Sequence, residues 1–106
     1  MILMEFSMIP LDKGASFSEY VARILALVDQ SGLDYRLNPM GTVVEGEWDD
    51  LFKLLTRCFR ALEQDSDRIS LQAKFDYRKG KASRIESKIR SVQAKVDRPL
   101  KTSQPG

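Results

Sequence analysis

The sequence contains no histidine, only one cysteine and no long apolar run. Histidine is the commonest general base at neutral pH and the commonest metal ligand, so its absence argues against most acid–base and metal chemistry. The single cysteine, Cys58, excludes an intrachain disulfide, and its helical apolar surroundings indicate a buried hydrophobe. No stretch approaches the roughly 20 apolar residues that span a bilayer. Since no nucleophile or metal-ligand cluster stands out either, we predict a protein that is not an enzyme and holds neither metal nor resident cofactor.

The 106 residues suit one compact domain, which we place at residues 1–97 and follow with a disordered basic tail over 98–106. The beginning of the chain lacks the basic leader and cleavage site of a signal peptide, so we expect a cytoplasmic protein. The net charge of +2 is unevenly distributed: residues 1–64 hold 6 Lys/Arg against 10 Asp/Glu, and residues 65–106 hold 11 against 5. A basic half can contact nucleic acid or membrane, but a solvated helix face is the simpler interpretation, and we expect neither partner.

Two segments alternate between apolar and polar residues as strands do. Residues 2–9 and 68–77 each present one apolar face and one mixed or polar face. Residues 34–38 and 42–46 are typical of two shorter strands joined by a turn over residues 39–41.

Three segments have helical apolar spacing. Ser16 with Glu19 forms a capping box for a helix that Gly32 ends. A second helix begins near Trp48, and its predicted buried face consists of Trp48, Leu51, Phe52, Leu55, Cys58, Phe59 and Leu62. A third follows the capping box of Ser83 with Glu86 and carries one stripe of Ile85, Ile89, Val92 and Val96.

The element order β-α-β-β-α-β-α predicts an α+β fold, the ferredoxin-like split βαβ arrangement with an antiparallel sheet and an added C-terminal helix. We expect the first and last strands to be neighbours in the middle of the sheet, with both long helices on one face. The open face then receives the mixed sides of these two strands, with Glu5, Ser7, Ser70, Gln72 and Lys74. The third strand contributes either Thr42 and Val44 or Val43 and Glu45, and the pattern does not decide between these pairs.

The segment NPMGTVVEGEW, residues 38–48, combines a tight turn, a short strand and a helix start. Pro39 cannot donate to a ladder, and we expect Gly41 to adopt backbone angles that other residues disfavour. This segment, with GLDY (32–35), EFSMIPL (5–11) and SFSEYVA (16–22), resembles a family of small proteins that bind thiamine or its hydroxymethylpyrimidine portion. The match covers most of the first half of the chain, in family order and spacing.

The resemblance implies a homo-oligomer, dimer or tetramer, that assembles through its sheets and binds its ligand near a subunit interface. Thiamine joins an aminopyrimidine to a cationic thiazolium, so a site needs donors and acceptors, apolar walls and negative charge. We assign the pyrimidine to Ser7, Asn38 and Thr42, and its wall to Met40, Phe6 or Tyr35. The cation is assigned to Glu5 or Glu45.

Plainer interpretations stay open for each residue. Asn38 is common in turns, Met40 can be turn packing, and Glu45 can be a surface partner of Lys74. The alternative for the whole chain is a structural or regulatory interaction module that oligomerises through its sheet without a small-molecule ligand. An RNA-recognition domain shares the element order, but it stacks bases on aromatic side chains where this open face carries Glu5 and Ser7.

Overall fold

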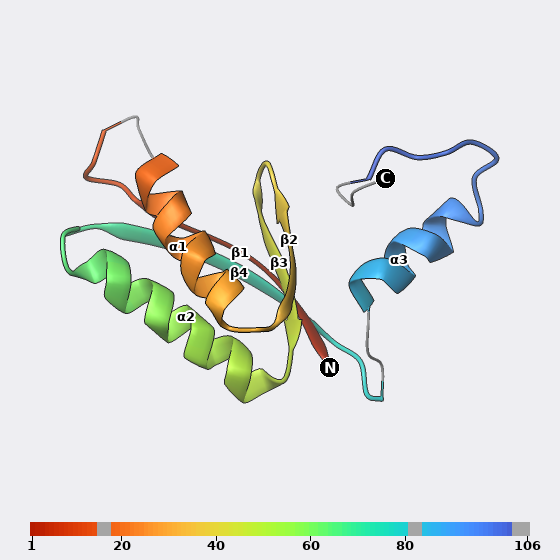
Figure 1. The fold of residues 1–106 in the computed structure, drawn as a ribbon, viewed down its shortest axis with the longest axis horizontal. Coiled ribbons are helices and arrows are strands. Elements are labelled where there is room, and N and C mark those ends of the chain that lie inside the picture. The colour runs from red at the N-terminus through yellow and green to blue at the C-terminus, as the bar shows by residue number, and fades with distance from the viewer. Residues whose placement is uncertain (15–17, 81–83, 103–106) are drawn as a thin grey trace.

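The computed structural model describes residues 1–14, 18–80 and 84–102. The elements follow the predicted order as β1 (Ile2–Pro10), α1 (Ser18–Gln30), β2 (Asp34–Asn38), β3 (Gly41–Gly46), α2 (Trp48–Glu63), β4 (Ile69–Tyr77) and α3 (Arg84–Gln93) (Figure 1). This confirms the α+β fold with an antiparallel sheet and an additional C-terminal helix. The capping residues predicted at Ser16 and Ser83 lie outside the described residues. No helix within the described part of the chain has the length and apolar character needed to cross a membrane.

The strand order in the sheet is β2-β3-β1-β4, and every neighbouring pair is antiparallel. β1 and β4 are neighbours as predicted, but the prediction that both lie in the middle is wrong: the central strands are β1 and β3, and β4 forms an edge. The hairpin of β2 and β3 occupies one side of β1. The chain returning from α2 pairs with the other side of β1.

The register of β1 against β3 decides which side chains share a face. Glu5 lies opposite Val43, and cross-strand partners project from the same side of a sheet. Val43 and Glu45 therefore lie on the open face, whereas Thr42 and Val44 point towards the helices.

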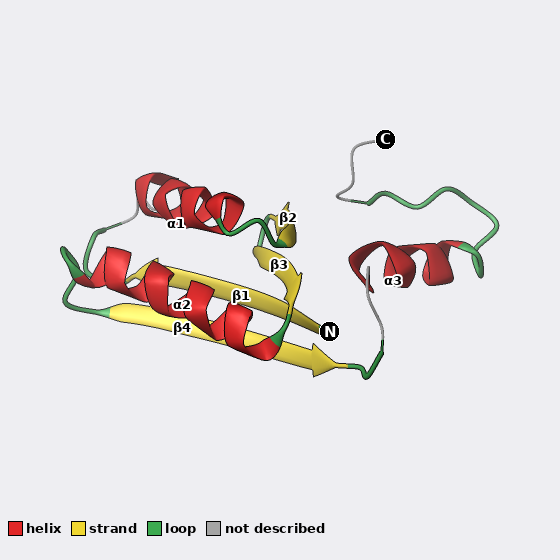
Figure 2. Ribbon diagram, turned by 60° about the horizontal axis from the view of Figure 1, so that its bottom comes forward, coloured by secondary structure: helices red, strands yellow, loops and turns green. Residues whose placement is uncertain are grey.

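Helices α1 and α2 cover one face of the sheet (Figure 2). The apolar side of β1 lies beneath them and is almost inaccessible, with Met4 at 0% and Phe6 at 3% exposure. Gly32 has a φ of +76° and ends α1 as predicted. The core includes Ile2, Met4, Phe6, Met8, Ile24, Val28, Val44, Leu51, Leu54, Leu55, Cys58 and Leu62.

Two aromatic residues predicted to be buried on α2 are not. Trp48 is 55% exposed and Phe52 is 37% exposed. α2 packs on the central strands β1 and β3. The side of α2 that carries Trp48 and Phe52 therefore lies over the edge strand β4, where solvent can reach it. There Trp48 and Phe52 contact Phe75 of β4, with ring centroids 5.7 and 5.2 Å away.

Helix α3 stands apart from the helical layer (Figure 2). Its first turn contacts the sheet at β3, where Ile85 is buried. Ion pairs hold it there, among them Glu86 with Arg36 of β2 at 3.4 Å and Lys88 with Asp76 of β4 at 2.7 Å. The predicted apolar stripe is thus only partly buried, since Val92 further along is 55% exposed.

Gly41 is required for a different reason from the one predicted. Its φ is not positive, unlike that of Gly32. A Cβ at Gly41 would instead lie 3.1 Å from the backbone oxygen of Phe6, tighter than a side chain tolerates without displacement. The glycine therefore allows the start of β3 to approach β1 closely.

Candidate functional site

A cavity of about 490 Å³ lies on the helical side of the sheet, within the range typical of ligand sites. Its walls come from the second half of β1, the flank of α1 and the turn between β2 and β3. The lining residues are Phe6, Ser7, Met8, Ile9, Val21, Ile24, Leu25, Leu37, Asn38, Pro39, Met40, Gly41 and Thr42.

The cavity exists because β3 is shorter than β1. β1 pairs with β3 as far as Phe6, which lies opposite Thr42 close to the start of β3. On its other side β1 remains paired with β4 as far as Pro10. None of the described strands pairs with residues 7–10 of β1 on the β3 side. Helix α1 covers this unpaired side of β1 and lines the cavity there. Backbone groups of β1 next to the gap can therefore face a ligand.

The polar side chains among the lining residues are few, and all of them are uncharged. Thr42 supplies a hydroxyl and Asn38 an amide, which together offer both donors and acceptors, and Ser7 lines the cavity on the side of β1 that β3 leaves unpaired. Thr42 is only 4% exposed, so its hydroxyl lies in a largely dry environment. None of the described lining residues is charged. Such a surface suits a flat, neutral, hydrogen-bonding ring.

Four of the seven predicted site residues line this cavity: Ser7, Asn38, Met40 and Thr42. Phe6, named as a wall, lines it too. The other three residues, Glu5, Tyr35 and Glu45, lie elsewhere.

Glu5 lies on the open face, where it lines a second, smaller cavity of about 250 Å³ with Gln72 and Lys74. Ser7 and Met40 line both cavities. The two cavities thus adjoin the same end of the sheet from opposite faces.

Tyr35 and Glu45 are engaged in other contacts. The Tyr35 hydroxyl donates to Asp29 at 2.9 Å, and this hydrogen bond raises the pKa of the phenol. Glu45 is 6% exposed, and its carboxylate accepts the backbone N–H of Ile85 at 3.3 Å. A carboxylate at the first turn of α3 is favourable because that end of a helix carries partial positive charge.

Sequence reasoning missed the contribution of α1. The helical spacing of Val21, Ile24 and Leu25 predicts only that they face the core, yet all three line the cavity. Spacing along a helix shows which residues face the sheet, but not where the sheet beneath them ends. A usable signal was the length difference between the nine-residue β1 and the six-residue β3.

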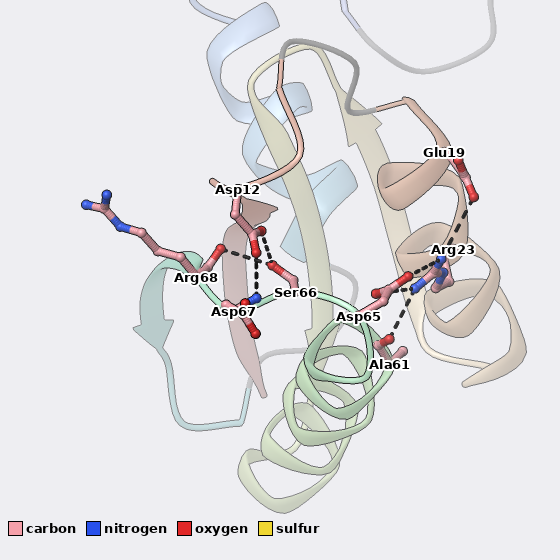
Figure 3. Close-up of polar contacts among 8 residues, drawn as sticks. All are labelled: Asp12, Glu19, Arg23, Ala61, Asp65, Ser66, Asp67 and Arg68. Atoms are coloured by element: carbon pink, nitrogen blue, oxygen red, sulfur yellow. Dashed lines mark hydrogen bonds and ion pairs between the residues drawn. The ribbon is translucent and has the colours of Figure 1, made fainter.

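Polar contacts fix the loops and α1 around the end of the sheet that holds the cavity (Figure 3). Asp12 accepts the Ser66 hydroxyl at 2.5 Å and the Asp67 backbone N–H at 2.6 Å, which joins the loop after β1 to the loop before β4. The Ser66 hydrogen bond is the main cause that lowers the pKa of Asp12. These contacts set the direction in which the chain leaves β1.

Arg23 holds α1 against the end of α2 (Figure 3). Its guanidinium donates to both carboxylate oxygens of Asp65, at 3.2 and 3.3 Å, and to the Ala61 carbonyl at 3.2 Å. The hydrogen bond from Arg23 lowers the pKa of Asp65. Because Val21, Ile24 and Leu25 lie on the same helix, this clamp also positions one wall of the cavity.

The described residues contain no group of three His, Cys, Asp or Glu side chains that could hold a metal ion. Cys58 is buried, and burial raises the pKa of its thiol to about 11. At neutral pH this thiol is protonated and therefore a poor nucleophile.

Comparison with known proteins identifies the family to which this chain belongs. The model of the thiamine-binding protein family matches residues 4–93, so the chain belongs to this family. The UPF0045 protein MJ1052 of Methanocaldococcus jannaschii is 36% identical over 91 residues, which are 86% of this chain and 91% of the relative. YqgV of Bacillus subtilis is 31% identical over 98 residues, covering 87% of this chain and 94% of YqgV.

Solved structures share the fold. The crystal structure of MJ1052 superposes with a TM-score of 0.80, covering 87% of this chain and 95% of that one. A Thermotoga maritima protein provisionally assigned to thiamine biosynthesis or salvage superposes with a TM-score of 0.76 at 26% identity, covering 86% and 97%.

Proposed function

We propose that this protein binds thiamine or its hydroxymethylpyrimidine portion, without catalysing a reaction on it, in the cavity between α1 and the β2–β3 turn. One observation carries the proposal. In a chain of the thiamine-binding family, Ser7, Asn38, Met40 and Thr42 come from three elements and the turn between two of them, and they converge on a single apolar cavity.

The pyrimidine portion matches the chemistry of this cavity. Its ring is flat and neutral, and it carries ring nitrogens that accept hydrogen bonds and an amino group that donates them. Thr42, Ser7 and Asn38 can supply the complementary groups, while Ile24 and Leu25 enclose the ring faces. Burial of an apolar ring and a few neutral hydrogen bonds would stabilise the complex without burying a charge.

The cationic thiazolium needs a different environment, and the neighbouring cavity on the open face offers one. Ser7 and Met40 line both cavities, and the second contains Glu5, which lies opposite Lys74 on the neighbouring strand. Met40 is 91% exposed, so its side chain can move to make way for a second ring. Of the two carboxylates considered for the cation, Glu5 is better placed, because Glu45 lies beneath the start of α3.

Binding in a homo-oligomer that assembles through its sheets remains part of the proposal. The open face carries Ile9 at the same end of β1 as the second cavity, and a second subunit there would enclose the thiazolium. A chain that oligomerises and binds neither compound would instead be a structural or regulatory interaction module.

Isothermal titration calorimetry with thiamine and with hydroxymethylpyrimidine tests the proposal. We expect saturable binding of both ligands, with one site per subunit. Absence of heat and of thermal stabilisation with both compounds would refute it.

A threonine pair provides the matched variants. Thr42→Val removes a buried hydroxyl in the cavity and keeps the shape of the side chain, so we expect affinity for hydroxymethylpyrimidine to fall about 2- to 12-fold, the value of one neutral hydrogen bond. Thr56→Val removes an exposed hydroxyl on α2 that donates to the Phe52 carbonyl. Affinity should be unchanged in this control. Equal affinity in both variants would place the pyrimidine away from Thr42.

A further inference from the structure

The hydrogen bonds at the two ends of the pairing of β1 with β4 show where the backbone groups of β1 point. Leu11 donates to the Arg68 carbonyl at 2.7 Å, and Arg78 donates to the Met1 carbonyl at 3.3 Å. Both bonds continue the register of β1 with β4 and join directly opposed residues. Along an antiparallel strand, such hydrogen-bonded positions alternate. The odd-numbered residues of β1 therefore bond to β4, and the even-numbered residues direct their N–H and C=O groups to the side of β3.

Met8 is the even-numbered residue at which β1 loses its partner on that side. Phe6 lies opposite Thr42 of β3, and the same register would place Met8 opposite Met40. Met40, however, belongs to the turn ahead of β3. Within the described part of the chain, no backbone group bonds to the N–H or C=O of Met8 on this side.

These two groups lie in a buried place beside the cavity. Met8 is only 3% exposed, and it is one of the lining residues. Buried backbone donors and acceptors in native proteins are almost always paired, with protein groups, water or a ligand. An adjacent N–H and C=O without a protein partner therefore mark a place where a ligand can bind.

The next even-numbered residue, Pro10, has no N–H to offer. It is fully buried, and proline within a strand occurs where its nitrogen faces no ladder partner. Its position agrees with a side of β1 that no strand covers. Of residues 7–10, Met8 alone thus directs both a donor and an acceptor to this side.

We propose that the backbone of Met8 recognises the aminopyrimidine edge of the ligand: its N–H donates to a ring nitrogen, and its C=O accepts from the neighbouring amino group. This inference rests on the proposed function and adds the source of its specificity. Opposed residues in a hydrogen-bonded antiparallel pair exchange both of their N–H···O=C bonds. A ring nitrogen next to an amino group presents the same acceptor and donor, so the ligand takes the place of the residue that β3 lacks.

Specificity for the amino group follows from the Met8 carbonyl. A pyrimidine that carries hydrogen in place of the amino group leaves this buried acceptor unpaired. We expect it to bind about 5- to 150-fold more weakly than hydroxymethylpyrimidine, the range that corresponds to one unsatisfied buried polar group. Equal affinity for the two compounds in calorimetric titration would overturn the role of the carbonyl.

Two variants of Met8 separate its backbone from its side chain. Met8→Leu keeps the N–H and nearly the volume of the side chain, so affinity for hydroxymethylpyrimidine should be unchanged. Met8→Pro removes the N–H without removing a bond to β3 or β4, and it leaves the ring nitrogen of the ligand unpaired. We expect its affinity to be about 5- to 150-fold below that of Met8→Leu. Circular dichroism of the two variants shows whether both keep the fold.

Nuclear magnetic resonance of the unaltered chain gives the direct test, and it decides the question even where Met8→Pro does not fold. An N–H···N hydrogen bond transmits a scalar coupling between its two nitrogens when protein and ligand are both ¹⁵N-labelled. We expect this coupling at the Met8 amide and not at the Phe6 amide, which faces Thr42 of β3.

The outcomes distinguish this inference from the proposed function. A saturated complex without coupling at Met8, or equal affinity of folded Met8→Pro and Met8→Leu, would overturn recognition by the backbone and leave ligand binding in place. A parent protein that binds neither hydroxymethylpyrimidine nor thiamine would refute the proposed function, and this inference with it.

Discussion

At the scale of single residues, Thr42 and Glu45 show how strongly a site depends on side-chain parity along a strand. Both were predicted to contact the ligand. Residues three positions apart on a strand project from opposite faces, so a regular β3 cannot direct both into one cavity. The structure places Thr42 on the helical side within the cavity and Glu45 on the open side under α3. The sequence alone could have shown that the two residues separate, but not which of them faces the helices.

Ser7 provides a residue-scale prediction because it lines both cavities. Ser7→Ala should lower the affinity for hydroxymethylpyrimidine by about 0.5–1.5 kcal/mol, the usual net value of one neutral hydrogen bond. Calorimetric titration of the variant measures this loss. Ser70→Ala is the matched control: Ser70 lies on the open face of β4 and lines neither cavity, so its loss should leave affinity intact. A dissociation constant for Ser7→Ala equal to that of the parent would remove Ser7 from the site.

At the scale of elements, the loops that flank the cavity are joined by carboxylates rather than by apolar packing. Asp12 receives two hydrogen bonds from the loop before β4, and Asp65 receives two from Arg23 of α1. Hydrogen bonds to a carboxylate favour its ionised form, which explains the lowered pKa of both groups. These elements should therefore loosen in acid.

The sign of this dependence follows from the direction of the shift. The pKa of Asp12 is lower in the folded protein than its ordinary value of 3.8, so its contribution is present above that value and is lost as pH falls through the folded pKa. Asp12→Asn should reduce stability at neutral pH and flatten the loss of stability as the pH falls below the ordinary pKa of 3.8. Urea unfolding at several pH values measures both effects. Parallel pH profiles for parent and variant would show that Asp12 is not coupled to folding.

Helix α3 is the element whose place was least predictable. Its apolar stripe was evident in the sequence, but a stripe does not identify the surface it meets. The structure docks its N-terminal half, through Ile85, Glu86 and Lys88, on the side of the sheet opposite α1 and α2. The contacts of Glu86 and Lys88 join residues 50 and 12 positions apart, and such pairings leave no local pattern in the chain.

At the scale of the whole molecule, element order and fold class were predictable because periodicity reports directly on secondary structure and burial. The position of β4 was not, since the alternation that marks a strand is similar at an edge and at the centre of an antiparallel sheet. The same limit explains Trp48 and Phe52. Their helical spacing predicted burial, and their exposure follows from the edge position of the strand beneath them.

Part of the cavity could be predicted from the sequence, and part could not. Its β1 and turn residues lie in segments that resemble the thiamine-binding family, and Ser7, Asn38, Met40 and Thr42 could be named from them. The wall that α1 contributes exists because β3 ends beneath this helix. That arrangement depends on how the sheet and the helices pack together, and the sequence pattern of α1 does not show it.

The most direct test of the central claim is a crystal structure of the protein with hydroxymethylpyrimidine bound. The account predicts the ring between α1 and the β2–β3 turn, within hydrogen-bonding distance of Thr42 and in contact with Ile24 and Leu25. A ring bound on the open face between Glu5 and Lys74, with the cavity beneath α1 unoccupied, would contradict it.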